Sequence, residues 1–301
     1  MMETGSGLRD YLQSFCAGET ILFFPNPGNA GDTLIAHATY QLFHDLHVHF
    51  EIVRDLRQAQ PDGRIVVYGG GGNLVPYYHY ARDVIQSLHL RARRMLVLPS
   101  SILGNQELLA SLGSNTEILC REAVSYEYVL GMAPRARVHL FHDMAFNLDV
   151  ERTLRENPLP IQPHLPRLAL RALLFEMDLL PDLTRLARAK ELAAFRTDQE
   201  ALAGDLPPGN LDLARRLSYG ADREDVARYV SWRMLYFLRR FERIRTDRLH
   251  ICIAGALLGK QVEFFANRYH KNKAVFEYSL RDRYPNVRWM GADPNFKGNE
   301  P

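Results

Sequence analysis

The chain has 301 residues, of which 47% are hydrophobic and 24% charged, a composition typical of a folded globular protein and not of a disordered or fibrous one. Its 37 lysines and arginines nearly balance 35 aspartates and glutamates, so the net charge of +2 gives no overall field that would recruit nucleic acid. At roughly 150 residues per domain, the length predicts two domains.

The first half alternates short apolar runs with longer amphipathic ones, the pattern of strands and crossover helices in an α/β fold. The expected strands cover residues 21–25, 49–56, 64–70, 95–101, 116–122 and 137–143. Helices are expected at about 33–44 and 77–90. At least five strand–loop–helix units in this order predict a Rossmann-like, doubly wound parallel sheet.

The second half predicts a smaller α/β unit. Five prolines between residues 158 and 181 interrupt regular structure, so we expect the boundary there and divide the chain into domains 1–155 and 156–301. The elements expected after the boundary are a strand at 191–200, a helix at about 223–245, a loop entering a helix over 246–260, a strand at 261–266 and a helix at 272–284. For the arginine-rich helix, packing on a sheet is the preferred interpretation and contact with a membrane surface the alternative.

Cysteine usage and hydropathy bear on the compartment. Cys16, Cys120 and Cys252 are far apart and odd in number, so we expect no disulfide framework and no zinc cluster, which fits a reducing cytosol. No basic region followed by an apolar run opens the chain, and the apolar stretch LHICIAGALLG is too short to span a bilayer. We therefore expect a cytoplasmic protein without a signal peptide or a membrane-spanning helix.

Two turns follow predicted strands, where Rossmann-like domains bind ligands. The first spans residues 26–32; its two glycines allow close backbone approach, and Asp32 either caps the next helix or contacts a ligand. The second is the run Gly69–Gly72 with Asn73, and four consecutive glycines favour a loop pressed against a ligand or another backbone. Neither turn matches a dinucleotide or P-loop motif, which disfavours a nicotinamide cofactor and ATP hydrolysis.

Further polar residues lie at the ends of apolar segments. Asp143 ends the last strand of the first half and is expected to face a cleft, whereas the adjacent His142 points to the opposite face and is interpreted as structural. In the second half, Arg248 can hold an anion without losing its proton, and His250 can exchange one near neutral pH. On these residues alone, a solvated helix start explains the pair more simply. Other polar residues at equivalent edges are Arg196, Asn267, His270 and Lys271.

Taken in order, several segments resemble the bacterial polysaccharide pyruvyl transferases, from about residue 20 to about residue 285. These segments are NPGNAGDTLI, VVYGGGGNL, REAVSYEYV, HDMAF, FRTDQE, TDRLHICIAGALLGK and NRYHKNKAVFEY. The resemblance implies a GT-B-like fold, with two Rossmann-like domains facing across a cleft. It also implies transfer of pyruvate from phosphoenolpyruvate to two hydroxyls of one sugar in a polysaccharide precursor, giving a cyclic ketal and phosphate.

The resemblance also assigns residues. Arg248-Leu249-His250 matches the family's functional Arg-Leu-His, which implies Arg248 on the anionic donor and His250 as the acid–base group. The expected catalytic residues are His250, Arg248 and Asp143, and the expected donor-binding residues are Arg248, Arg196, Asn267 and Lys271. The expected acceptor-binding residues, on the first domain, are Asn29, Gly31, Asp32, Gly70, Gly71, Gly72 and Asn73. His270 departs from the glycine expected before Lys271.

The chemistry of the donor agrees with these residue types. Phosphoenolpyruvate carries a phosphate and a carboxylate, so its site needs cations and backbone N–H groups. Protonation of its methylene carbon calls for a general acid that titrates near neutral pH, which suits His250. Asp32, Asp143 and Asp247 are the candidates for orienting or deprotonating the hydroxyls. Such a step requires no redox cofactor and no obligatory metal, so none is expected.

Two other functions stay open at this point. One is a GT-B glycosyltransferase that uses a nucleotide sugar, and the other is an inactive scaffold in polysaccharide assembly. The retention of Arg248 and His250 argues against the scaffold. The expected partners are phosphoenolpyruvate and a sugar or lipid-linked acceptor, whose assembly at the inner face of the membrane would bring the protein there. The sequence leaves open the sugar, the pair of hydroxyls bridged and the oligomeric state.

Overall fold

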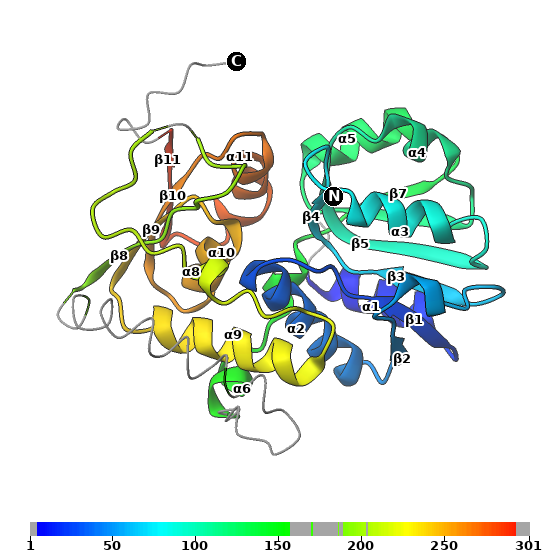
Figure 1. Cartoon of the computed structure of the whole chain (residues 1–301), viewed down its shortest axis with the longest axis horizontal. Coiled ribbons are helices and arrows are strands. Elements are labelled where there is room, and N and C mark those ends of the chain that lie inside the picture. Colours follow the sequence, from blue (N-terminus) through cyan, green and yellow to red (C-terminus); the bar gives the residue numbers. More distant parts are fainter. Residues whose placement is uncertain (1–4, 157–169, 171–185, 187–188, 203, 293–301) are drawn as a thin grey trace. The chain divides into compact units, whose positions relative to one another are not determined.

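The computed structural model describes residues 5–156, 170, 186, 189–202 and 204–292 (Figure 1). The chain forms two compact units. The first unit comprises Met1–Pro27, Ile35–Leu148 and Ala221–Arg223, and the second comprises Gly28–Leu34, Asp149–Gly220 and Glu224–Pro301. The main change of unit comes after Leu148, close to the expected boundary, but Gly28–Leu34 belongs to the second unit. Most of the proline-rich segment lies outside the described residues.

The first unit contains a seven-stranded sheet in the order β2-β1-β3-β5-β6-β7, with β4 pairing to β5, and every pairing is parallel. The strands are β1 (Thr20–Phe24), β2 (His49–Ile52), β3 (Ile65–Tyr68), β4 (Gly71–Leu74), β5 (Arg94–Ile102), β6 (Thr116–Cys120) and β7 (Arg137–Leu140). The helical elements are α1 (Gly5–Cys16), α2 (Ala30–Asp45), η1 (Leu56–Gln58), α3 (Tyr80–Leu88), α4 (Gln106–Ser111), α5 (Ala123–Met132) and η2 (Met144–Asn147). The predicted α/β class with a parallel sheet is confirmed.

Burial follows from the sequence of the central strands. Every residue of β3 and β6 is buried, as expected for apolar runs in a parallel sheet with both faces covered. The chain turns from β2 back past β1 to β3, so the order of strands reverses between β1 and β3. Such a switch point brings the loops after the two strands together at the carboxyl edge of the sheet, where ligands bind in α/β folds.

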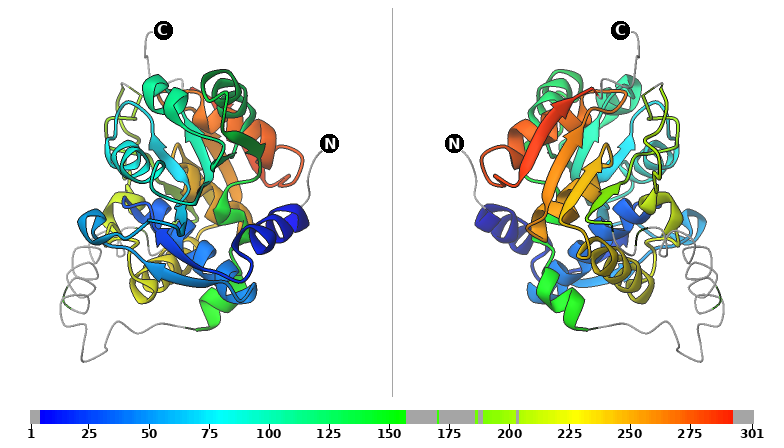
Figure 2. Two further views of the ribbon diagram at one scale, coloured as in Figure 1. Left: turned by 90° about the vertical axis from the view of Figure 1, so that its right-hand side faces the viewer. Right: turned by 90° about the vertical axis from the view of Figure 1, so that its left-hand side faces the viewer.

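The second unit has a four-stranded parallel sheet in the order β11-β10-β9-β8. Its strands are β8 (Glu191–Ala193), β9 (Arg243–Thr246), β10 (Gln261–Phe265) and β11 (Val287–Gly291), the last three visible from gold to red in the right-hand view of Figure 2. Its helices are α6 (Val150–Arg155), α8 (Leu213–Arg216), α9 (Glu224–Leu238), α10 (Leu249–Leu257), α11 (Lys271–Val275) and the π-helical turn η3 (Phe276–Leu280). A Cβ on Gly255 of α10 would lie 2.9 Å from Val262, so this glycine lets α10 pack closely on β10.

Three predicted elements differ in the structure. The helix expected at 223–245 ends at Leu238, and the strand β9 begins at Arg243. Burial alternates along the four residues of β9, as is typical of a strand. The strand expected at 191–200 ends at Ala193, since the charged residues after it form a turn with partners of their own. The second half of the predicted glycine turn is β4, and α1 and β11 were not predicted.

The packing of α9 decides how its arginine-rich sequence is interpreted. Val226, Val230 and Phe237, on its apolar face, are at most 7% exposed. The apolar face of α9 is therefore buried, and its main contacts are with the helices α6 and α10, so packing on the sheet itself stays a prediction. Within the described residues, no helix has both the length and the hydropathy needed to traverse a bilayer.

Candidate anion-binding and acid–base site

Polar or charged residues follow three neighbouring strands of the second unit. Arg196 comes three residues after β8, Arg248 two residues after β9 and Asn267 two residues after β10. These strands are parallel neighbours, so their carboxyl ends share one edge of the sheet. The structure thus brings together the four residues expected to bind the donor, because Lys271 begins α11 just after β10.

Arg248 is held by two carboxylates. Its Nε and Nη2 donate to the two carboxylate oxygens of Asp212 at 3.0 and 2.6 Å, and its Nη1 lies 2.7 Å from Asp198 Oδ2. Arg248 and Asp212 are each less than a tenth exposed. A planar guanidinium paired in this bidentate way has a fixed orientation. Arg248 is therefore positioned before any ligand binds.

Arg196 and Lys271 share a second set of carboxylates. Arg196 donates from Nε to Asp198 Oδ1 at 2.8 Å and from Nη1 to Glu200 Oε2 at 2.7 Å. Lys271 Nζ donates to the same oxygen of Glu200 at 2.5 Å, and Asn267 Nδ2 at 3.4 Å. Burial by itself lowers the pKa of Arg196, but the charges of Glu200 and Asp198 outweigh it and leave that pKa raised. Three buried cations thus lie in one connected network.

Asp247 differs from the other acids at this edge. It is 5% exposed, and one of its carboxylate oxygens accepts the backbone N–H of Arg196 at 2.8 Å. Burial raises the pKa of Asp247 to about 6, although that hydrogen bond and the charges of Arg196 and Arg248 act in the opposite direction. Asn272 also donates to the backbone oxygen of Asp247, at 2.6 Å. Asp247 can therefore exchange a proton within the physiological range.

His250 lies in the first turn of α10, beside the start of α2. A Cβ built on Gly31 would collide with Nδ1 of its imidazole, so only glycine fits at position 31 with the ring in this place. Arg248 is the N-cap residue of α10, yet its side chain forms no capping hydrogen bond and the first turn contains no acid. The partial positive charge of that helix end is therefore not offset by an acid in the first turn.

Asn29 and Asp32 cap α2 reciprocally. Asn29 Oδ1 accepts the N–H of Gly31 at 2.8 Å, and Asp32 Oδ2 accepts the N–H of Asn29 at 3.1 Å. This is the capping-box arrangement, so the capping interpretation of Asp32 is confirmed. The backbone oxygen of Gly28 accepts a hydrogen bond from Ser218 Oγ at 3.0 Å, which ties this turn to the second unit.

The residues expected to bind the acceptor are divided between the two units. Asn29, Gly31 and Asp32 belong to the second unit, whereas the glycine run and Asn73 belong to the first. In the glycine run, a Cβ on Gly70 would lie 2.5 Å from the backbone oxygen of Pro99, so contact with another backbone explains this residue. The amide of Asn73 donates to Asn26 Oδ1 at 2.9 Å, which joins β4 to the loop after β1.

Asp143 does not face a cavity, contrary to the expectation. It is fully buried, and its carboxylate forms an ion pair of 2.6 Å with Arg121, which is 1% exposed. Its other oxygen accepts the N–H of Ala145 at 2.8 Å and so caps η2. Arg121 also donates to Ser101 Oγ at 2.9 Å. These contacts give Asp143 a structural role in the first unit and leave no oxygen directed at a substrate.

Three acids of the network were missed by the sequence reasoning. Asp198 and Glu200 lie in the FRTDQE segment, where their spacing from Arg196 was the available signal. Asp212 lies 36 residues from Arg248, and nothing in the local sequence indicates that pairing. Asp212 also accepts hydrogen bonds from the N–H and hydroxyl of Thr197, both at 2.9 Å.

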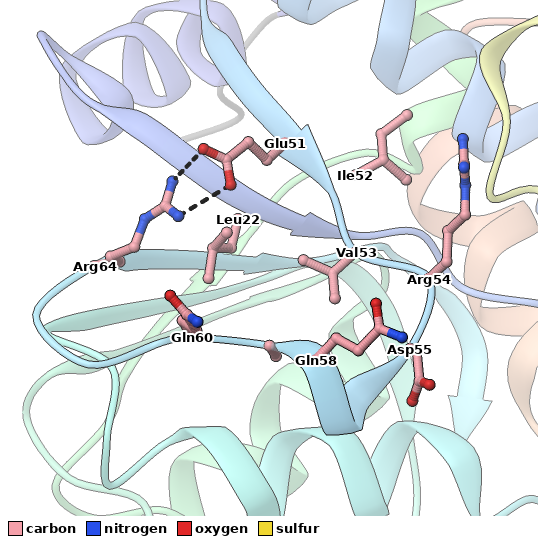
Figure 3. Close-up of a pocket in the computed structure, with 10 residues that line it drawn as sticks. Leu22, Glu51, Ile52, Val53, Arg54, Asp55, Gln58, Gln60 and Arg64 are labelled. Carbon is pink, nitrogen blue, oxygen red and sulfur yellow. Dashed lines mark hydrogen bonds and ion pairs between the residues drawn. The ribbon is translucent and has the colours of Figure 1, made fainter.

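The first unit contains a separate pocket of about 430 Å³, shown in Figure 3. It lies beside the connection from β2 to β3, which contains only the short η1 turn and no longer helix. Leu22 and Val53 are among the residues that line the pocket. Its charged residues are paired: Arg64 with Glu51, Arg54 with Asp222 and Asp55 with Arg57. The side chains of Gln58 and Gln60 form no hydrogen bond with any described residue. The pocket thus offers amides to a neutral, hydroxyl-rich ligand.

Comparisons with known proteins identify the family to which the chain is similar. The family model described as "Polysaccharide pyruvyl transferase" matches residues 29–269. The chain is 27% identical over 291 residues to "Putative pyruvyl transferase EpsO" of Bacillus subtilis (strain 168), covering 88% of this chain and 86% of that protein. It also resembles the solved structure of the functionally uncharacterised protein KP1_0663 of Klebsiella pneumoniae, with a TM-score of 0.76 and 29% identity over 97% of this chain and 100% of that one.

Proposed function

Because the chain belongs to the polysaccharide pyruvyl transferase family, we propose that it transfers pyruvate from phosphoenolpyruvate to two hydroxyls of one sugar in a polysaccharide precursor. The products are a cyclic ketal and inorganic phosphate. One observation carries the proposal: three buried cations share one carboxylate network at an edge of the sheet of the second unit, and His250 follows Arg248 by two residues. A donor with a carboxylate and a phosphate suits such a site.

The donor is held by charge and by backbone dipoles. Arg248 and Arg196 present guanidinium groups, and the start of α10 adds N–H groups without a competing acid in its first turn. Lys271, which is paired with Glu200, is the third cation at this edge. Phosphoenolpyruvate is bound in this proposal with its enol carbon next to His250.

The reaction then needs two C–O bonds to the same carbon. His250 donates a proton to the methylene carbon of the donor, and a sugar hydroxyl attacks the resulting oxocarbenium-like centre. The C–O bond to phosphate breaks next, and the second hydroxyl attacks the same carbon to close the ketal. Of the two hydroxyl protons, one restores the acid that protonated the methylene carbon and the other leaves with phosphate. Asp247 is the carboxyl that accepts one hydroxyl proton and passes it to the departing phosphate, because Asp32 and Asp143 are engaged as helix caps.

The acceptor is proposed to be a sugar or lipid-linked oligosaccharide, used by a cytoplasmic enzyme at the inner face of the membrane. We keep the GT-B-like arrangement as part of the proposal, with the acceptor on the first domain and the donor on the second. The pocket beside Gln58 and Gln60 supports this division, since its paired charges and unbonded amides suit a neutral sugar. No redox or metal cofactor takes part in the proposed steps.

The test is direct. The protein is incubated with phosphoenolpyruvate and a panel of nitrophenyl glycosides and lipid-linked sugars, and two products are followed: released phosphate and an acceptor heavier by one pyruvate less one water. His250→Ala is expected to abolish both signals, whereas His79→Ala, at an exposed position before α3, is the matched control. A His250→Ala variant with full activity would refute the catalytic assignment. Thermal stabilisation by UDP but not by phosphoenolpyruvate would favour the nucleotide-sugar glycosyltransferase instead.

A further inference from the structure

We propose that the carboxylate of Asp198 occupies the place of the anionic donor and is exchanged for it on binding, while Asp212 and Glu200 stay in place and hold the cations. Phosphoenolpyruvate as the anion rests on the proposed function; the exchange itself concerns any small carboxylate or phosphate. The inference starts from the contacts of the network, in which each cation has a carboxylate partner.

The first step is a balance of charge. Arg196, Arg248 and Lys271 carry three positive charges, and three carboxylates of the network, Asp198, Glu200 and Asp212, lie within ion-pair distance of them. The network is therefore neutral as it stands, before the further acid Asp247 is considered. An anionic ligand gains little from a neutral cluster, since attraction by the cations is cancelled by repulsion from the acids. One carboxylate must leave for the site to attract the donor.

Asp198 is the acid best placed to leave. Its side chain is 29% exposed, against 7% for Asp212 and 4% for Glu200. It is also the acid that bridges the two arginines, through Oδ2 to Arg248 at 2.7 Å and Oδ1 to Arg196 at 2.8 Å. A ligand carboxylate or phosphate arriving from solvent therefore meets Asp198 first, between two guanidinium groups that accept bidentate partners.

The other two acids are more deeply buried than Asp198, which itself accepts the backbone N–H of Glu200 at 3.1 Å. Asp212 accepts two hydrogen bonds from Thr197 and one from the N–H of Arg215, as the N-cap of α8, in addition to its two bonds with Arg248. Glu200 receives Arg196 and Lys271 on one oxygen and is almost fully buried. Moving either acid would leave buried charges without partners, which is costly. Moving Asp198 exposes its carboxylate to water, and the incoming anion replaces it.

The protonation state of Asp198 agrees with an exchange of one anion for another. Burial acts to raise its pKa, but the hydrogen bond from Arg196 and the charges of Arg196 and Arg248 leave that pKa below its ordinary value. Asp198 therefore stays ionised and leaves as a carboxylate. This separates its role from that of Asp247, whose pKa is raised by burial.

The experiment measures binding and not turnover. Full-length wild-type protein, Asp198→Asn, Asp198→Ser and Asp212→Asn are titrated with inorganic phosphate and with phosphoenolpyruvate in a calorimeter. The matched control is Asp62→Asn, which removes an exposed carboxylate paired with Arg91 in the first unit. Circular dichroism confirms that each variant is folded, and the two substitutions at position 198 guard against the failure of one.

Both variants at position 198 are expected to bind the two anions at least about tenfold more tightly, because a full like charge is removed at contact distance. Asp212→Asn and Asp62→Asn are expected to show no such gain. Unchanged or weaker binding by the variants at 198 would overturn the proposal, and so would an equal gain in either of the other two variants, since that would be a general effect of charge. Absence of ketal formation by the wild type would refute the proposed function and leave the phosphate titration valid.

Discussion

Replacing Asp247 with asparagine is expected to stabilise the second unit at neutral pH. The pKa of Asp247 rises from its ordinary value of 3.8 to about 6 in the folded protein, chiefly because the side chain is buried. The folded state thus binds this proton more tightly than the unfolded state does. The difference corresponds to a cost of about 3 kcal/mol in the free energy of unfolding when the carboxyl is ionised.

The sign of the pH dependence follows from the raised pKa. Below about pH 4 the carboxyl is protonated in both states and the cost is absent; it grows as the pH rises from about 4 to about 6 and is constant above that. Asparagine is neutral throughout, and its amide oxygen can still accept the backbone N–H of Arg196. The variant should therefore gain up to about 3 kcal/mol at pH 7.5 and almost nothing near pH 4.

The chain offers a selective probe for this measurement. Its two tryptophans, Trp232 and Trp289, both belong to the second unit, so their fluorescence reports on the unfolding of that unit in urea. Asp205→Asn, on an exposed loop of the same unit, is the matched control and should change little. A variant at position 247 that is no more stable than the wild type at pH 7.5, or that gains equally at both pH values, would refute the reasoning. Transfer activity should fall in the same variant, because its proton acceptor is gone.

Three further perturbations test separate parts of the structure. Gly31→Ala places a methyl group against the imidazole of His250 and should lower kcat by about tenfold or more. The control is Gly131→Ala, where a Cβ meets no atom within 4 Å, and this variant should keep the wild-type rate. Equal rates in the two variants would contradict the packing of Gly31 against His250. Asp143→Ala strands the buried charge of Arg121 and should destabilise the first unit by about 3–5 kcal/mol in calorimetry, a loss below about 1 kcal/mol being incompatible with the buried pair. Replacing both glutamines of the pocket by alanine should raise KM for an oligosaccharide acceptor several-fold with kcat retained, and an unchanged KM would remove the pocket from acceptor binding.

The sequence predicts the strands of the first unit well, because parallel strands buried on both faces appear as short apolar runs bounded by turns. It fails where one segment supports two periodicities. Phe241 and Ile244 continue the apolar spacing of α9, yet the chain turns after Leu238 and Ile244 lies in β9. Tertiary pairing with β8 and β10 decides that segment, and no local pattern contains this information.

In the candidate site, too, local sequence pattern predicts some residues and long-range contacts decide the others. Arg196, Arg248 and Lys271 lie at the ends of apolar segments, where parallel strands share one edge, but their donor-binding role was taken from the resemblance to the pyruvyl transferases. Their acid partners were not chosen, since a pair such as Arg248 and Asp212 depends on a long-range fold. Asp143 was misassigned because position at a strand end does not reveal that a buried arginine already holds the carboxylate.

The order of the charges along FRTDQE restricts how this protein can vary in length. Arg196, Asp198 and Glu200 lie within five consecutive residues, and each contributes to the same network. Insertion or deletion of one residue there would separate charges that must meet, and no side-chain substitution nearby would restore them. Residues 204–206 and Pro208 downstream are exposed, so a change of length at that loop would leave the network intact. Relatives should therefore keep the spacing of the pentapeptide and differ in the length of the loop after it.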